Sequence, residues 1–60
     1  MKVEVSKSYV NWKGEIVTIL SEDMPKDGKR VFIDTVGRSY FENGEYYYAD
    51  NEYSLVSEVS

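Results

Sequence analysis

Short stretches rich in β-branched and aromatic residues alternate with turn-forming residues along this chain. Such stretches are typical of β-strands, because these side chains pack well on a pleated surface. No window shows the period of an amphipathic helix. The sequence therefore predicts an all-β fold, either a small barrel or a strongly bent antiparallel meander of about five to six short strands. The predicted strands are residues 8–12, 15–21, 30–34, 39–42, 45–49 and 53–59.

Glycine and proline mark the turns between the predicted strands. Lys13-Gly14 and Asn43-Gly44 are each flanked by strand-like residues, which predicts two hairpins with two-residue loops. Residues 22–29 combine proline, glycine and charge, and they are predicted to form the longest loop.

The expected register of the first hairpin divides its residues between two faces. With a two-residue loop, Trp12 pairs with Glu15. Val10 then pairs with Val17, and Ile19 lies on the same face. Both faces of this hairpin would be partly apolar, as expected of a bent strand that serves two sides of a barrel.

The second hairpin divides the aromatic residues between two faces. With a two-residue loop, Phe41 pairs with Tyr46, and Tyr48 joins them on one face. Tyr40 and Tyr47 lie together on the opposite face, because successive strand residues point to alternate sides. One set is expected to line the core and the other to lie near solvent.

Length and composition predict a single all-β domain over residues 1–60. The chain contains neither Cys nor His, so a small core has no disulfide or zinc site to stabilise it. Aromatic packing is the remaining source of stability, with six Tyr, two Phe and one Trp. Homodimerisation would bury additional apolar surface, although the sequence does not require it.

No segment predicts export or membrane insertion. The N-terminus lacks the apolar core of a secretory signal, and no apolar run approaches the ~20 residues that span a bilayer. The absence of Cys is typical of proteins in a reducing compartment. We therefore expect a soluble cytoplasmic protein.

Charge is unevenly distributed along the chain. Residues 1–30 carry six basic and five acidic side chains, whereas residues 31–60 carry one basic and six acidic side chains. Nucleic-acid binding rests largely on Lys and Arg that neutralise phosphates, so the second half argues against it. An acidic surface favours a basic protein partner instead.

The sequence offers no catalytic equipment. Without His or Cys, the commonest general base and the thiol nucleophile are both missing. The glycines stand singly in turns and form no phosphate-binding loop. The acidic residues of segment 22–27 lack the spacing of a calcium loop. We expect no catalytic residue, cofactor or metal site, and hence a protein that is not an enzyme.

The Tyr-rich, acidic C-terminal hairpin is the leading candidate for a binding surface. Tyrosine offers a large contact area at low entropic cost and is enriched at interfaces. Acidic neighbours would steer a basic partner towards it. The competing interpretation is that the tyrosines simply suit strands and form part of a barrel wall. The candidate protein-binding residues are Tyr40, Glu42, Glu45, Tyr46, Tyr47, Tyr48, Asp50 and Glu52.

A second candidate surface surrounds the single tryptophan. An exposed indole can stack on a base of single-stranded nucleic acid, and nearby cations can hold the phosphates. The competing interpretation makes the tryptophan a hydrophobic lid over one end of a barrel. The residues of this alternative are Trp12, Lys13, Lys26, Lys29 and Arg30.

Turn glycines and apolar strand positions also form a wider pattern: Tyr9, Val10, Gly14, residues 17–20, Val31, Asp34, Gly37, Tyr40, Gly44 and residues 53–56. This pattern resembles SH3-like small barrels, a group that includes KOW-type modules. It also looks like small uncharacterised proteins encoded by tailed phages and prophages. The resemblance implies a non-enzymatic accessory protein in the host cytoplasm that engages a host or phage protein. The chain lacks the basic positions of nucleic-acid-binding KOW modules.

Taken together, these features predict a small protein-binding module that acts by occlusion. One version is a phage-encoded inhibitor of a host enzyme or defence complex that presents an acidic, Tyr-rich face to a basic surface. The alternatives are a single-stranded nucleic-acid-binding barrel and a homo-oligomeric structural or assembly protein that uses exposed strand edges.

Overall fold

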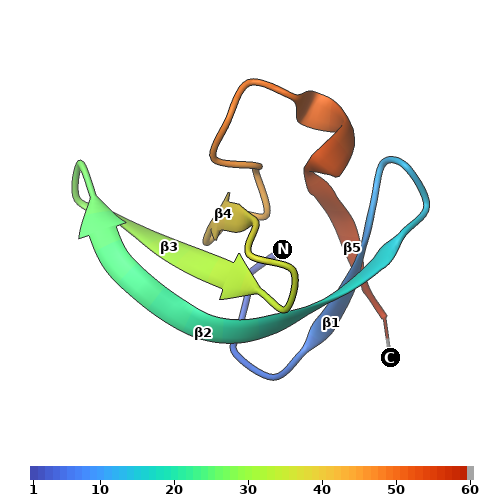
Figure 1. The fold of residues 1–60 in the computed structure, drawn as a ribbon, viewed down its shortest axis with the longest axis horizontal. Coiled ribbons are helices and arrows are strands. Elements are labelled where there is room, and N and C mark those ends of the chain that lie inside the picture. Colours follow the sequence, from blue (N-terminus) through green and yellow to red (C-terminus); the bar gives the residue numbers. More distant parts are fainter. Residues whose placement is uncertain (60) are drawn as a thin grey trace.

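Five antiparallel strands form one sheet in the computed structural model, which describes residues 1–59. The order across the sheet is β4-β3-β2-β1-β5, so β1 to β4 follow one another as a meander, and β4 and β5 are its two edges (Figure 1). The all-β prediction is confirmed, and the sheet is open. The elements are β1 (Ser8–Asn11), β2 (Ile16–Lys26), β3 (Lys29–Asp34), β4 (Ser39–Phe41), the 3-10 helix η1 (Asn51–Tyr53) and β5 (Leu55–Val59).

Three of the turns share one geometry, in which a three-residue loop ends in glycine. In the β1–β2 loop, the Asn11 amide donates to the Glu15 carbonyl and the Gly14 amide donates to the Asn11 carbonyl, each at 3.0 Å. The turns at Gly37 and Gly44 repeat both hydrogen bonds. All three glycines have positive φ, at +85°, +93° and +94° in chain order. This is a type I turn closed by a left-handed residue.

The prediction of two-residue loops is therefore wrong, and the pairing register shifts by one residue. In the first hairpin Val10 pairs with Ile16 rather than with Val17. In the second, Tyr40 rather than Phe41 lies opposite Tyr46. The final glycine of each loop is the extra residue, because its left-handed conformation adds one residue before the second strand.

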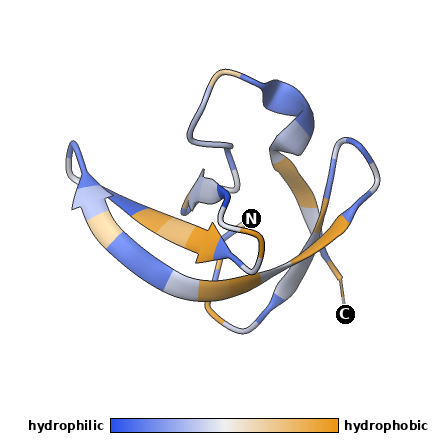
Figure 2. Ribbon diagram, viewed as in Figure 1, coloured by the Kyte–Doolittle hydropathy of each residue, from blue (hydrophilic) through white to orange (hydrophobic). Residues whose placement is uncertain are grey.

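The predicted long loop over residues 22–29 is replaced by a continuation of the β2–β3 hairpin. The turn consists of Asp27 and Gly28, with φ of 54° and 75°, between the paired residues Lys26 and Lys29. Positive φ at both positions is typical of a type I′ turn, which Asp-Gly favours. Every residue from 20 to 30 is exposed, so the hairpin extends beyond the core, and its far end is largely hydrophilic (Figure 2).

The predicted strand over residues 45–49 is absent from the described chain except for one bridge between Tyr40 and Tyr46. The backbone still follows the outer edge of β4, because the Phe41 amide donates to the Glu45 carbonyl and the Tyr47 amide donates to the Ser39 carbonyl. Beyond Tyr47 the chain bends away into an arch that leads to η1 (Figure 1).

The core lies inside the bend of the sheet and is closed by the N-terminal segment. The Val3 amide donates to the Glu42 carbonyl at 2.8 Å, and the Tyr9 hydroxyl accepts the Glu4 amide at 2.8 Å. No helix among residues 1–59 has the length and apolar character that crossing a membrane requires. The buried apolar residues of this core are Val3, Tyr9, Val17, Ile19, Phe32, Tyr40 and Leu55, and Val31 is buried outside this cluster.

Candidate protein-binding surface

Tyr40 belongs to the core and not to the exposed surface. Its side chain is 0% exposed, and its hydroxyl donates to Oδ2 of Asp34 at 2.7 Å. Burial raises the pKa of Tyr40, and the hydrogen bond to Asp34 raises it further. Oδ1 of Asp34 accepts the amides of Val36 and Arg38 at 3.0 and 2.9 Å. Asp34 and Tyr40 thus hold the β3–β4 turn in place. Because it is buried, Tyr40 is unavailable to a partner.

The remaining tyrosines of the hairpin divide between the core side and the outer side of the sheet. Tyr46 packs against the core and lies 5.7 Å from Tyr40 between ring centroids. Tyr47 lies on the other side, 5.3 Å from the ring of Phe41. The ring of Tyr48 contacts the rings of Tyr46 and Tyr47 edge-on, and Tyr48 is 63% exposed. Phe41, Tyr47 and Tyr48 together form a continuous aromatic patch, called here the aromatic surface.

Tyr53 anchors the end of the arch. The guanidinium carbon of Arg38 lies 4.1 Å from the centroid of its ring, and the Lys13 ammonium lies 5.1 Å from it. The Lys13 amide also donates to the Glu52 carbonyl at 3.2 Å. These contacts hold η1 against the β1–β2 loop, so Tyr53 has a structural role beside the aromatic surface.

Folding neutralises much of the acidic C-terminal half. Glu42 accepts a hydrogen bond from Arg30 at 2.8 Å, and Glu52 pairs with Lys13 at 3.9 Å. In the described chain no ion pair is formed by Glu45 or Asp50, the other two acidic residues of the predicted patch. Glu45 and Asp50 are therefore the acidic residues of the patch that have no cationic partner among the described residues.

The five residues of the nucleic-acid alternative do not converge. Trp12 is 69% exposed, which rules out the interpretation of a lid over a barrel end. Trp12 and Lys13 lie in the loop before β2, whereas Lys26 and Lys29 lie at its far end (Figure 1). Because β2 runs for 11 residues, the two groups stand at opposite ends of a long strand.

Arg30 is already committed to other side chains. Its Nε and Nη2 atoms donate to the two carboxylate oxygens of Glu22 at 2.8 Å each, and Nη1 donates to Glu42. The hydrogen bonds from Arg30 lower the pKa of Glu22. The guanidinium also lies over the ring of Phe32 at 5.2 Å. This bidentate geometry leaves Arg30 few donors for a phosphate.

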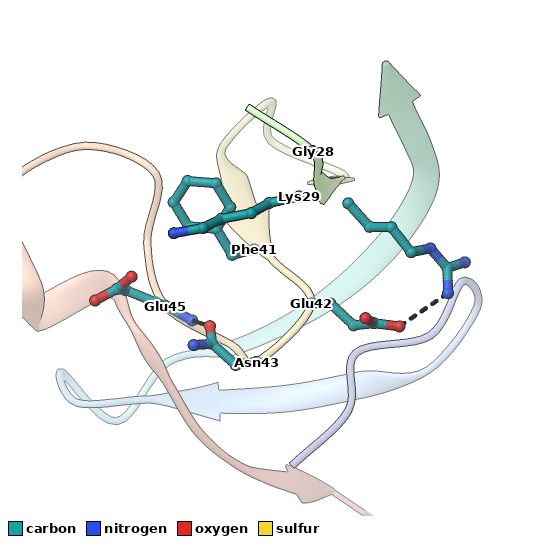
Figure 3. A pocket seen from close by; sticks show the side chains of 7 residues that line it. Gly28, Lys29, Phe41, Glu42, Asn43 and Glu45 are labelled. Atoms are coloured by element: carbon teal, nitrogen blue, oxygen red, sulfur yellow. Dashed lines mark hydrogen bonds and ion pairs between the residues drawn. The ribbon is translucent and has the colours of Figure 1, made fainter. Parts of the chain in front are cut away.

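A pocket of about 410 Å³ opens beside the aromatic surface, between the β2–β3 turn and the loop after β4 (Figure 3). Phe41 forms its wall, and the Lys29 ammonium lies 5.4 Å from the centroid of that ring. Glu45 lies at its margin. Phe41 is not among the predicted binding residues. The correct strand register would identify Phe41 as a surface residue, because it pairs Phe41 with Val31 on the outer side of β3.

No group of three or more acidic side chains within residues 1–59 is placed to hold a metal ion. The side chains that this region presents are arranged for aromatic contacts, ion pairs and hydrogen bonds. Comparison of the chain with protein-family models, with curated proteins and with solved structures found no match in any of the three.

Proposed function

We propose that this chain is a small non-enzymatic protein-binding module that acts by occlusion, through the aromatic surface and the adjacent Glu45. The observation that carries the proposal is the run of contacting rings from Phe41 to the exposed Tyr48. Aromatic side chains on a backbone fixed to a sheet edge provide contact area with little entropy to lose. Glu45 and Asp50 would guide a basic protein surface towards these rings.

Three finer proposals concern fold, origin and location. The Leu55 amide donates to the Gly44 carbonyl at 2.8 Å, which joins β5 to the loop after β4 and supports an SH3-like barrel. The origin from a phage or prophage, with a host enzyme or defence complex as the target, stays a prediction from the sequence pattern. A cytoplasmic location likewise stays a prediction.

Substitution on the aromatic surface or at Glu45 is expected to reduce partner capture. Immobilised protein would be incubated with lysate of the source cell, and retained proteins compared between variants. Tyr48→Ala and Glu45→Lys should each reduce capture about tenfold or more, because truncation of an interface anchor has effects of this size. Trp12→Ala removes a comparably exposed ring that is not part of the aromatic surface and serves as the control. Equal capture by wild type and Tyr48→Ala would contradict the proposal.

A second candidate function, self-assembly, is favoured by the outer edge of β5 beyond Leu55, the residue whose amide bonds to Gly44. The outer edge of β4 is covered by residues 45–47, whereas β5 pairs with β1 alone among the described strands. Val56 and Val59 are exposed on β5, and its only charge, Glu58, is neutralised by Lys7 at 3.4 Å. An edge without an unpaired charge is a template for a second strand.

Self-assembly through β5 predicts a concentration-dependent mass. Sedimentation velocity between micromolar and millimolar protein should show a dimer for wild type and a monomer for Val59→Lys. Val36→Lys places the same charge on an exposed residue of the β3–β4 turn and should leave the dimer intact. A wild-type monomer at every concentration would remove this candidate and leave the aromatic surface unaffected.

A further inference from the structure

We infer that the pocket beside Phe41 receives an arginine side chain of the protein partner, and that Lys29 occupies its cation position in the free protein. The inference rests on the proposed protein-binding function and names the group that this surface recognises. Figure 3 shows the arrangement, in which Lys29 extends across the ring of Phe41 with its ammonium directed to the side of Glu45.

The wall of the pocket is a fixed aromatic face. Phe41 ends β4, where it pairs with Val31 of β3, and its ring contacts that of Tyr47 at 5.3 Å between centroids. Lys29 lies 5.4 Å from the same centroid, which shows that a cation fits over this ring. An aromatic face attracts a cation through its quadrupole.

A carboxylate lies at the margin of the same pocket. The Glu45 amide donates to Oδ1 of Asn43 at 2.9 Å, and the Glu45 carbonyl accepts the Phe41 amide at 2.8 Å, so its backbone position is fixed. Its carboxylate forms no ion pair with the described residues. Glu42, the other acid of the pocket, is engaged by Arg30. Glu45 is thus the carboxylate that remains for a ligand.

A fixed aromatic face next to a carboxylate suits a guanidinium better than an ammonium. The planar guanidinium stacks on a ring and can donate two parallel hydrogen bonds to a carboxylate at its edge. The Lys29 ammonium lies over the ring of Phe41 but, within residues 1–59, forms no ion pair with a carboxylate. It follows the type I′ turn on an exposed hairpin end, so it can move aside without disturbing the core.

The inference predicts that removing Lys29 opens the site. Binding of N-acetyl-arginine amide at millimolar concentration would be followed by two-dimensional ¹H–¹⁵N NMR of the full chain. Lys29→Met keeps an apolar stem but removes the competing cation, and it should tighten binding about threefold, the size expected for loss of an exposed cation–π contact. Glu45→Gln should weaken binding in both backgrounds. Shifts should concentrate at residues 28–30 and 41–45.

Matched probes separate arginine recognition from general adhesion. N-acetyl-citrulline amide has a neutral side chain of similar shape and should cause no shifts, and N-acetyl-lysine amide should bind more weakly than the arginine probe. Equal shifts with citrulline, or weaker arginine binding by Lys29→Met, would overturn the inference. Lysate capture that is lost with Tyr48→Ala but unchanged by Lys29→Met and Glu45→Gln would refute the arginine pocket and retain protein binding through the aromatic surface alone.

Discussion

Replacing Asp34 by Ala is expected to leave most of the protein unfolded at 25 °C. The side chain is 1% exposed and accepts hydrogen bonds from the Tyr40 hydroxyl and from the amides of Val36 and Arg38. Each buried donor left without an acceptor costs about 1–3 kcal/mol. A core of this size rarely supplies more than about 3–5 kcal/mol in total. Circular dichroism during urea titration measures the decrease in the free energy of unfolding.

Two Tyr-to-Phe substitutions, one buried and one exposed, test whether the hydrogen bonds to Asp34 account for this loss of stability. Tyr40→Phe removes one of the three hydrogen bonds to Asp34 and should lower the free energy of unfolding by about 1–2 kcal/mol. Tyr48→Phe removes an exposed hydroxyl and should change it by less than about 0.5 kcal/mol. If Asp34→Ala unfolds at the same urea concentration as wild type, the buried network does not stabilise the fold.

The positions of most strands could be predicted from the sequence, whereas their register could not. A glycine ends both a two-residue type I′ loop and a three-residue loop with a left-handed final residue. Lys13-Gly14 and Asn43-Gly44 therefore look alike in either case, and a two-residue loop predicts registers that differ by one residue from those in the structure. The Asp27-Gly28 turn is hard to find from the sequence, because the Pro and the charges around it are typical of a loop.

The candidate surface was predicted in part for the same reason. Alternation correctly places Tyr46 and Tyr47 on opposite sides, but a two-residue loop places Tyr40 with Tyr47 and Phe41 with Tyr46. In the structure Tyr40 packs against Tyr46 and Phe41 against Tyr47. Charge counts along the chain also cannot show ion pairs between distant segments. Glu42 and Glu58 lie in the acidic half, yet cations of the other half neutralise both. Packing, rather than composition, decides which charges stay free.

Gly44→Ala is expected to cost more stability than the same substitution at Gly37, although both glycines end the same kind of turn at φ near +94° and +93°. A Cβ at Gly37 would meet no atom within 4 Å, so its cost is the left-handed conformation, about 1–2 kcal/mol. A Cβ at Gly44 would collide with the Met1 side chain and crowd the Leu55 carbonyl oxygen at 3.3 Å. Crowding a packed site adds about 1–3 kcal/mol.

Comparing Gly44→Ala with Gly37→Ala isolates the contact between β5 and the turn after β4, because both glycines have the same turn geometry. The Met1 methyl group can move, but the Leu55 carbonyl belongs to the backbone, and the Leu55 amide donates to the Gly44 carbonyl at 2.8 Å. An alanine at Gly44 therefore pushes apart the two segments that this hydrogen bond joins. Urea titration of both variants measures the difference, and equal losses would mean that the approach of β5 to this turn tolerates a methyl group without strain.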